Sequence, residues 1–456
     1  MQVLIVSTNT LPASPSGPAY IAGAALQAGH TVEVFECLFA QDLTGELTAH
    51  IARFAPDVIG VSIRLVHGFV IDENAEFNTC HLDLRVRVRQ VVDCIKQVSN
   101  ARIVLGGPGF NYYARDWLEY LGLDYGIRGE ADLSFPLYLK RLEEDGDVTT
   151  VPGCVFRRDG QIVKTPREFI KNLDATAFPA YELFDLDKYA EHNISPAILA
   201  KRGCAFRCIY CPYSSLEGNR YRLKSPPRVV DEIEHVQRVK RPKLFIFCDN
   251  NFNVPRPHAE AICQQIIARK LNIRWGTGDL RPMGVIDEFC QLMRDSGCAY
   301  ANVSIESGSD KMLKRMKRGY TTAHIRQTLE CLGRANIPFG ASLMIGAPGE
   351  TSETIAESLA LLDNYAIPLG TWVTIGICLW THRQQILDEA RREGQFKDDR
   401  ELFEGAHYMS PALSKDYMIE LIKTLKAKKG YTVQVNKPHA EAATAQAASY
   451  GMKWAT

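Results

Sequence analysis

The sequence predicts an α/β protein in which a doubly wound parallel sheet is followed by a partial (β/α)6 barrel. Three observations lead to this class. Strand and helix signals alternate through residues 1–150, a second strand–helix series follows a turn-rich segment, and 456 residues are too many for one small core. Apolar residues make up 46% and charged residues 23% of the chain, which excludes fibrous and largely disordered classes.

The first series occupies residues 1–150. Short apolar runs predict five strands, at 3–7, 31–35, 57–63, 102–105 and 125–127. Helical segments separate them, such as 18–28, which stops at Gly29, a residue type common just after a helix. Strands that alternate with helices imply parallel pairing, and ligands of such sheets bind beyond the carboxyl ends of the strands.

The segment 151–190 is expected to link two domains, because it contains the turn dipeptides Pro152-Gly153 and Asp159-Gly160. A barrel is expected over 191–395, with strands at 197–200, 243–248, 273–276, 299–305, 339–345 and 372–378. Residues 396–430 are expected to be a C-terminal helical segment. Residues 431–456, rich in Ala, Thr and Gln, are expected to form a mobile tail.

Charge and cysteine content restrict the partners and the compartment. Lys plus Arg and Asp plus Glu are both 53, so the net charge is zero and nothing favours a nucleic-acid or membrane partner. No apolar run is long enough to cross a bilayer, and the start lacks a basic region followed by an apolar one. The cytoplasm is the expected location, and the 13 cysteines are expected to be free thiols or metal ligands.

The most informative stretch contains Cys204, Cys208 and Cys211, directly after the first strand of the second series. A loop this short brings three sulfurs together at a small entropic cost, and thiolates favour soft metal centres. A four-iron cluster normally takes four cysteines, so three would leave one iron open to another ligand. Zinc would need a fourth ligand, which residues 212–215 lack. The alternative is a coincidental trio of core cysteines.

With Tyr210, these cysteines match the pattern C-x3-C-x-aromatic-C, and here the chain resembles the radical S-adenosylmethionine (SAM) superfamily. The resemblance implies a [4Fe-4S] cluster whose fourth iron binds SAM. It also implies reductive cleavage of SAM to a 5′-deoxyadenosyl radical, an external electron donor of flavodoxin or ferredoxin type, and a position of Tyr210 near the adenine.

Three later segments extend the resemblance, each at the end of a predicted strand. They are 248–252 with Asp249, 304–308 with Glu306, and 346–350 with Gly346, and the resemblance implies SAM contacts by these residues. Each also has a structural alternative. Asp249 could cap a turn, Glu306 could accept a structural hydrogen bond, and Gly346 could provide a positive φ.

The layout also resembles the subclass with an N-terminal cobalamin-binding-type domain, through Gly106-Gly107-Pro108 and the Gly before Glu130. The resemblance implies cobalamin, with His67, Gly106, Gly107 and Glu130 as candidate contacts, and small residues here would leave room for a flat corrin. The D-x-H-x-x-G motif, whose histidine ligates cobalt in other cobalamin domains, is absent.

The favoured function is a cobalamin-dependent C-methyltransferase that acts on an unactivated carbon of a small-molecule metabolite. One alternative is a cyclase, oxidase, rearrangement or SAM-fragment transfer enzyme with the same domains. Another is an iron–sulfur redox or scaffold protein. Substrate contacts are expected from a mixed aromatic and polar set at the barrel mouth: Trp275, Arg281, Trp372, Trp380 and His382.

Overall fold

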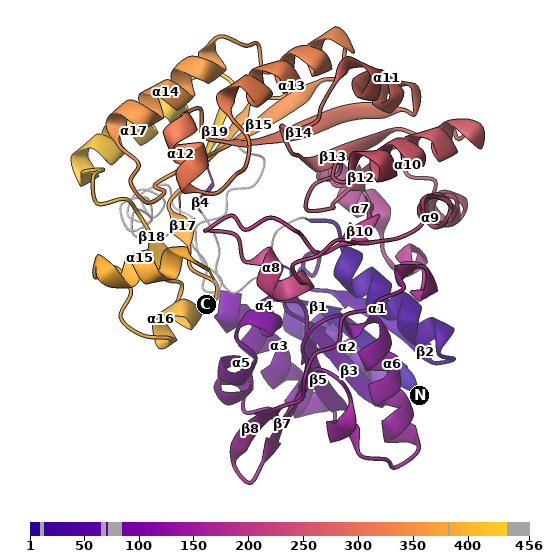
Figure 1. The fold of residues 1–456 in the computed structure, drawn as a ribbon. Helices are drawn as coiled ribbons and strands as arrows, with labels where there is room; N and C mark the ends of the chain where they lie inside the picture. Colours follow the sequence, from indigo (N-terminus) through magenta and orange to yellow (C-terminus); the bar gives the residue numbers. More distant parts are fainter. Residues whose placement is uncertain (10–12, 65–69, 72–83, 382–383, 436–456) are drawn as a thin grey trace. The chain divides into compact units, whose positions relative to one another are not determined.

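The chain, described here by a computed structural model, forms two compact units (Figure 1). The first contains residues 1–66, 83–203 and 216–243, and the second contains 67–82, 204–215 and 244–456. The structure describes all residues except 10–12, 65–69, 72–83, 382–383 and 436–456. The chain therefore leaves the first unit for residues 204–215 and then returns to it.

The first unit is built on a seven-stranded sheet of order β2-β1-β3-β5-β6-β7-β8. The first five of these pair in parallel, as the alternating signals predict, and their bounds are β1 Gln2–Ser7, β2 Thr31–Glu36, β3 Val58–Ser62, β5 Arg102–Gly106 and β6 Tyr125–Ile127. The strand order reverses at β1, between β2 and β3. Right-handed connections then place α1 and α2 on opposite faces of the sheet.

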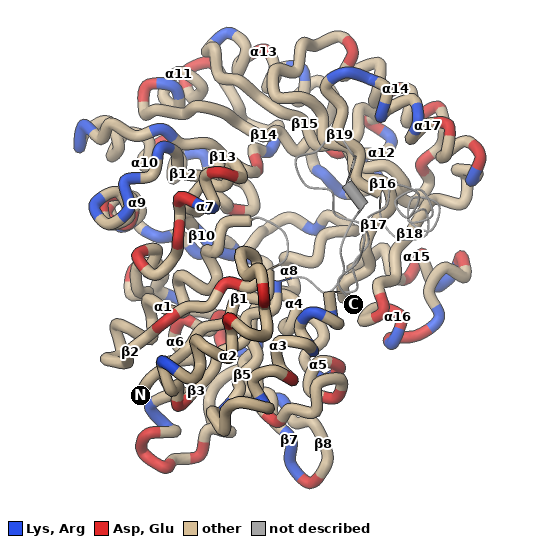
Figure 2. Tube along the Cα trace, turned by 180° about the vertical axis from the view of Figure 1, so that it is seen from behind, with Lys and Arg blue, Asp and Glu red and all other residues tan. Residues whose placement is uncertain are grey.

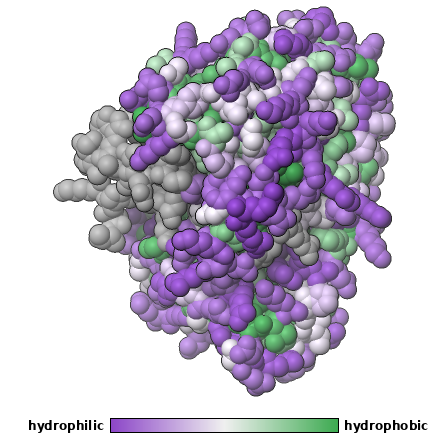
Figure 3. All heavy atoms as spheres, turned by 60° about the vertical axis from the view of Figure 1, so that its left-hand side comes forward, coloured by the Kyte–Doolittle hydropathy of each residue, from purple (hydrophilic) through white to green (hydrophobic). Residues whose placement is uncertain are grey.

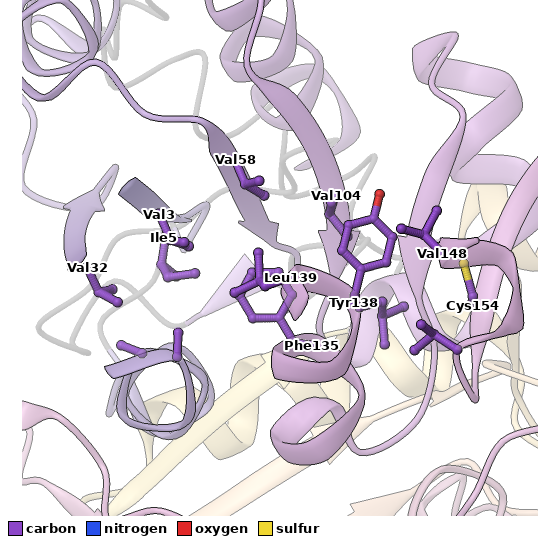
Figure 4. Packing of buried hydrophobic residues seen from close by; sticks show 14 of the residues in the cluster. Val3, Ile5, Val32, Val58, Val104, Phe135, Tyr138, Leu139, Val148 and Cys154 are labelled. Atoms are coloured by element: carbon purple, nitrogen blue, oxygen red, sulfur yellow. The ribbon is translucent and has the colours of Figure 1, made fainter. Parts of the chain in front are cut away.

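The helices of this unit are α1 Ser16–Gln27, α2 Leu43–Phe54, α3 Leu84–Val98, α4 Pro108–Tyr112, α5 Ala114–Leu121, α6 Ala131–Glu143, α7 Leu186–Glu191 and α9 Pro226–Lys240. α1 packs beside α6, and α2 packs beside α3. Figure 4 shows the core between sheet and helix, where Val3, Ile5 and Val58 face Phe135 and Leu139 of α6.

The segment expected as a linker, 151–190, instead continues the first sheet. The hairpin strands β7 Cys154–Arg158 and β8 Gln161–Lys164 flank the Asp159-Gly160 turn, and β7 pairs antiparallel with β6. Cys154 and Phe156 lie in the same core as α6, which explains why the hairpin is not a free connection. The short strands β9 Ala197–Ile198, β10 Lys201–Arg202 and β11 Arg222–Leu223 follow, and β10 pairs with β11.

The second unit is also built on parallel strands, in the order β19-β16-β15-β14-β13-β12. Their bounds are β12 Phe245–Phe247, β13 Trp275–Leu280, β14 Cys298–Glu306, β15 Phe339–Ile345, β16 Thr371–Ile375 and β19 Tyr431–Val435. β4 Val70–Ile71 pairs antiparallel at the β19 edge, and β17 Ile377–Cys378 pairs with β18 His407–Tyr408. The predicted strand–helix alternation is therefore present from 244 onward.

The helices connecting these strands are α10 Arg256–Ala268, α11 Asp287–Asp295, α12 Asp310–Arg315, α13 Thr322–Arg334, α14 Ser352–Asp363, α15 Ile386–Arg392, α16 Arg400–Glu404 and α17 Lys415–Ala427. The short α8, Tyr213–Glu217, follows the cysteine loop. Figure 1 shows α10, α11, α13 and α14 along one side of this sheet. More than half of the residues in each of β14, β15 and β16 are buried.

The C-terminal expectation was wrong for residues 431–435, which form β19 and not a mobile tail. β19 pairs along its length with β16, from Thr371 opposite Tyr431 to Ile375 opposite Val435. This pairing satisfies the backbone of β19, and burial of Val433 and Val435 adds apolar contact. The remainder of the expected tail lies outside the described residues.

Along the described trace, Lys and Arg residues are interspersed with Asp and Glu residues, as Figure 2 shows. In Figure 3 hydrophilic residues cover most of the visible face and hydrophobic ones occur in small, separate groups. Among the described residues, no helix combines the length and apolar character needed to traverse a bilayer.

Candidate functional site

The cysteine loop follows β10 without regular secondary structure until α8. Cys204 is buried, whereas Cys208 and Cys211 are partly exposed. The backbone N–H of Cys211 donates to the carbonyl of Cys208 over 3.2 Å, which folds this part of the loop into a turn. The N–H of Ile209 donates to the carbonyl of Met316, so the middle of the loop is tied to the segment after α12.

Two nitrogen donors approach the sulfurs of the loop. Arg318 Nη1 lies 3.3 Å from Cys208 Sγ, and Asn251 Nδ2 lies 3.7 Å from Cys204 Sγ. Donors of this kind stabilise thiolates that bind metal. Burial raises the pKa of the Cys211 thiol to about 12, so a cation must displace its proton on binding.

The residues present fit a soft metal centre by their chemistry. Three thiols lie on one short loop, and thiolates are ligands that soft metals favour. Among the described residues, no three His, Cys, Asp or Glu side chains form a metal-holding group.

Arg318 is the centre of the polar network beside this loop. Its guanidinium donates to the hydroxyl of Tyr210 over 2.7 Å and to the hydroxyl of Tyr320 over 2.7 Å, and it also contacts Cys208. Its second terminal nitrogen lies 3.6 Å from the carboxylate of Glu306. One buried cation thus brings together the loop and the end of β14.

Glu306 itself has a strained backbone, with φ at +62°, where β14 ends. The register with β15 shifts between Ser304 and Glu306, so the strand turns its last residue out of the regular pleat. Burial raises the pKa of Glu306, and the charge of Arg318 partly offsets that effect. Non-glycine residues at positive φ are concentrated at functional sites, and Glu306 fits that pattern.

Asp279, near the end of β13, is a further acidic group at the same strand ends. Its carboxylate accepts a hydrogen bond from Ser304 Oγ over 2.6 Å. Burial raises the pKa of Asp279 to about 7, against the lowering effects of the Ser304 hydrogen bond and of Arg318. The carboxyl ends of β13 and β14 therefore hold two acidic groups that keep their protons more readily than exposed carboxyls.

The other two predicted SAM residues lie at strand ends as expected. Asp249 is buried two residues after the end of β12 and two residues before Asn251, which contacts the cysteine loop. Gly346 has φ at +108° directly after β15, and a Cβ there would lie 2.7 Å from the sulfur of Met409. Glu350 closes the turn by accepting the backbone N–H groups of Gly346 and Ala347.

Gln384 supports the loop from another direction. Its amide donates to the carbonyl of Tyr210 and, over 3.2 Å, to the carbonyl of Cys378. The oxygen of the same side-chain amide accepts a hydrogen bond from the backbone N–H of Thr381 over 3.1 Å. Tyr210 is therefore fixed at its hydroxyl by Arg318 and at its backbone by Gln384.

The predicted cobalamin contacts of the first unit have mixed surroundings. A Cβ on Gly107 would lie 2.5 Å from the carbonyl oxygen of Ile63, so this glycine allows a close approach within the unit. Gly106 has space, with its nearest neighbour 3.9 Å from a Cβ. Glu130 accepts a hydrogen bond from Arg222 over 2.6 Å and from the N–H of Ile170 over 2.8 Å. His67 lies outside the described residues.

The expected barrel-mouth residues are not brought together. Trp275 is fully buried against Phe247 and Phe252, so it belongs to the core, while Trp372 is 37% exposed. Trp380 is partly buried, and Arg281 is buried beside the cysteine loop and not at an open mouth. His382 lies outside the described residues.

Sequence reasoning missed several residues of this network: Asn251, Asp279, Arg318, Tyr320 and Gln384. Arg318 stands in a run of charged residues after α12, which has the composition of a solvated helix end. Asn251 could have been found, because it lies in the same Asp-Asn-Asn segment as Asp249. The others have no local sequence signal.

Comparison with known families agrees with this arrangement. The sequence model of the radical SAM superfamily matches residues 198–362, which include the cysteine loop and the strand ends from β12 to β15. The model of the B12 binding domain matches residues 3–139, which include the five parallel strands of the first sheet. The first family implies a [4Fe-4S] cluster and SAM, and the second implies cobalamin.

Two relatives with low sequence identity cover most of the chain. An uncharacterized methyltransferase of Pyrococcus horikoshii is 26% identical over 349 residues, which are 76% of this chain and 72% of that protein. The anaerobic magnesium-protoporphyrin IX monomethyl ester cyclase of a Synechocystis strain is 28% identical over 329 residues, 71% of this chain. The chain spans 62% of the length of that cyclase.

Solved structures show the same fold. The methyltransferase TsrM of Kitasatospora setae, with cobalamin and a [4Fe-4S] cluster bound, aligns with a TM-score of 0.77 at 20% identity, covering 91% of this chain and 85% of TsrM. The cobalamin-dependent radical enzyme OxsB aligns with a TM-score of 0.68 at 14% identity, covering 93% of this chain and 61% of OxsB. The chain thus carries a B12-binding domain in front of a radical SAM domain, and it shares its fold with solved cobalamin-dependent radical SAM enzymes.

Proposed function

We propose that this protein is a cobalamin-dependent methyltransferase that uses SAM to methylate a carbon of a small organic molecule. The observation that carries the proposal is the joining of a B12-binding domain to a radical SAM domain whose cysteine loop is tied through Arg318 to Tyr210 and Glu306. When bound, the cluster, SAM and cobalamin supply the radical and methyl-transfer chemistry.

In this proposal Cys204, Cys208 and Cys211 hold the cluster. Tyr210, Asp249, Glu306 and Gly346 hold SAM at the carboxyl ends of the strands, where parallel α/β enzymes bind their ligands. The nitrogen donors of Arg318 and Asn251 support the negative charge on two of the three sulfurs. Gly106 and Gly107 remain candidate cobalamin contacts, because they lie at the end of β5 in the B12-binding domain.

The substrate class rests on the named relatives. A tryptophan 2-C-methyltransferase of Streptomyces laurentii is 22% identical over 335 residues, and a cytidylyl-2-hydroxyethylphosphonate methyltransferase of Streptomyces wedmorensis is 24% identical over 406 residues. Both act on small molecules by their names, which supports a small-molecule substrate here. An external one-electron donor is part of the proposal, since the cluster must be reduced.

A cyclase is the second candidate, because three relatives are anaerobic magnesium-protoporphyrin IX monomethyl ester cyclases. The two candidates differ in the fate of SAM. A methyltransferase that uses the radical gives both S-adenosylhomocysteine, from methyl donation, and 5′-deoxyadenosine, from hydrogen abstraction, whereas a cyclase that only abstracts hydrogen gives 5′-deoxyadenosine alone.

The cluster assignment is tested with Cys208→Ala after anaerobic purification and reconstitution with iron and sulfide. We expect the parent to bind about four iron ions per chain and the variant to lose most of that iron and the iron–sulfur absorbance. Cys290→Ala, in a buried thiol of α11, is the matched control and should retain the iron. Full iron content in Cys208→Ala would remove Cys208 from the ligand set.

The reaction type is tested by incubating the reduced parent protein with SAM, with and without bound cobalamin. We expect S-adenosylhomocysteine to form only with cobalamin, measured by mass spectrometry against the Cys208→Ala variant. Formation of 5′-deoxyadenosine without S-adenosylhomocysteine would favour the cyclase. Absence of both products from a protein with a full cluster would contradict both candidates.

A further inference from the structure

Arg281, directly after β13, is a buried cation beside the cysteine loop. It is 1% exposed, and its guanidinium carbon lies 3.5 Å from the ring centre of Phe206 and 5.0 Å from that of Tyr320. Asn253 fixes its backbone, accepting the N–H of Arg281 over 3.0 Å and donating to its carbonyl over 2.9 Å. Within the described part of the chain, no carboxylate forms an ion pair with this side chain.

The guanidinium is not satisfied by hydrogen bonds. Within the residues that the structure describes, neither Nε nor one terminal nitrogen of Arg281 has a hydrogen-bond partner. Burying a charged donor without an acceptor is costly, and contact with aromatic rings recovers only part of that cost. A negative charge bound close to the guanidinium in the working protein would offset the cost of burying it.

The nearby carboxylates do not provide that negative charge. The charge of Arg281 lowers the pKa of two carboxyls in the described part of the chain, Asp279 and Glu306. The carboxylate of Glu306 is already paired with Arg318, and that of Asp279 accepts the hydroxyl of Ser304. Each of these two carboxylates therefore has another partner than Arg281.

Phe206 connects Arg281 to the cysteines, because it lies between Cys204 and Cys208. A [4Fe-4S] cluster on three thiolates is negative overall, and one-electron reduction adds a further negative charge. A cation fixed nearby, in an environment of low dielectric, stabilises the reduced form more than the oxidised form.

We propose that Arg281 is a positioning residue with two effects: it orders the cysteine loop through Phe206, and it raises the reduction potential of the cluster. This inference rests on the proposed function, in which Cys204, Cys208 and Cys211 are the cluster ligands. The charge of Arg281 eases the entry of the electron that SAM cleavage requires.

The test is a redox titration of the reconstituted clusters, followed by electron paramagnetic resonance of the reduced form. In Arg281→Met, which keeps apolar contact with Phe206 but has no charge, we expect the ratio of reduced to oxidised cluster at a fixed potential to fall at least tenfold. For a one-electron couple this corresponds to about 59 mV toward more negative values. Arg281→Lys, which keeps the charge, should stay within threefold of the parent.

Two controls separate charge from packing. Phe206→Leu keeps Arg281 and should leave the ratio within threefold, while releasing iron faster to a chelator because the loop is less ordered. Arg334→Met removes an exposed arginine on α13 and should change neither quantity. A Phe206→Leu protein that loses iron at the parent's rate would overturn the ordering role.

An Arg281→Met protein with full iron and an unchanged ratio would overturn the inference on the potential. If that variant holds no iron, Arg281→Lys decides, since a tenfold fall in its ratio would also overturn it. A parent chain without a cluster would instead overturn the proposed function, so the two failures are distinguishable.

Discussion

At the scale of single residues, the site depends on side chains that link strand ends to the cysteine loop. Arg318 contacts Cys208, Tyr210 and Glu306 at once, although it lies more than 100 residues after the loop. Asn251 contacts Cys204 from the segment after β12. A hydrogen bond acts over a short distance, so it fixes such side chains only when the backbone that carries them is rigid. Parallel strands provide that rigidity.

Glu350 provides a residue-scale prediction on pH. This carboxyl is 1% exposed, and burial raises its pKa to about 7 despite its two backbone hydrogen bonds. Because the unfolded chain releases this proton near pH 4.3, the native state binds more protons between the two pKa values. The free energy of unfolding therefore falls as pH rises from about 4 to about 7, by on the order of 3 kcal/mol.

In Glu350→Gln we expect that part of the pH dependence to disappear, measured by urea unfolding at pH 5 and pH 8 with circular dichroism. The neutral amide oxygen can still accept a hydrogen bond from Gly346 or Ala347. Glu353→Gln, an exposed residue in the first turn of α14, is the control and should keep the parent's slope. An unchanged slope in Glu350→Gln would mean that Glu350 is charged in the native state at pH 5.

At the scale of elements, strands formed by continuous apolar runs were predictable, and strands defined by their partners were not. Apolar runs at 3–7 and 339–345 mark β1 and β15 almost residue for residue, because both are buried on two faces. Tyr431–Val435 alternates apolar and polar residues, which is a strand signal, but the run is short and stands beside an Ala-rich tail whose composition predicts disorder. The pairing with β16 establishes that it is a strand.

The candidate site was predictable to the same extent. Cys208, Tyr210 and Glu306 stand in motifs whose spacing is visible in one segment, and the structure joins all three through Arg318. Asp279 and Arg318 could not be found, because a lone charged residue has no spacing that marks it as buried. Folding is what brings them to the ends of β13 and β14.

At the scale of the whole molecule, the chain visits the first unit on both sides of the cysteine loop. Residues 216–243 return to that unit after the loop and contribute α9. A buried network joins α9 to α1: Lys224 lies 2.5 Å from Glu232, and the hydroxyl of Tyr20 donates to Glu232. Lys224 is 1% exposed and Glu232 is fully buried, so the first unit is completed by residues some 200 positions after its start.

This network leads to a prediction on stability. Lys224→Met leaves the carboxylate of Glu232 buried without its cation, which should cost about 3–5 kcal/mol in the free energy of unfolding. The double variant Lys224→Met/Glu232→Gln removes both charges and keeps an acceptor for Tyr20, so it should recover more than half of that loss. Thermal or urea unfolding of both proteins gives the comparison.

Lys140→Met is the control. It removes one partner of an exposed ion pair at the end of α6 and should lower the free energy of unfolding by less than about 1 kcal/mol. If the loss of unfolding free energy in the double variant equalled the sum of the losses in Lys224→Met and Glu232→Gln, the two residues would not be coupled. The return of the chain to the first unit would then have to be stabilised by apolar packing of α9 alone.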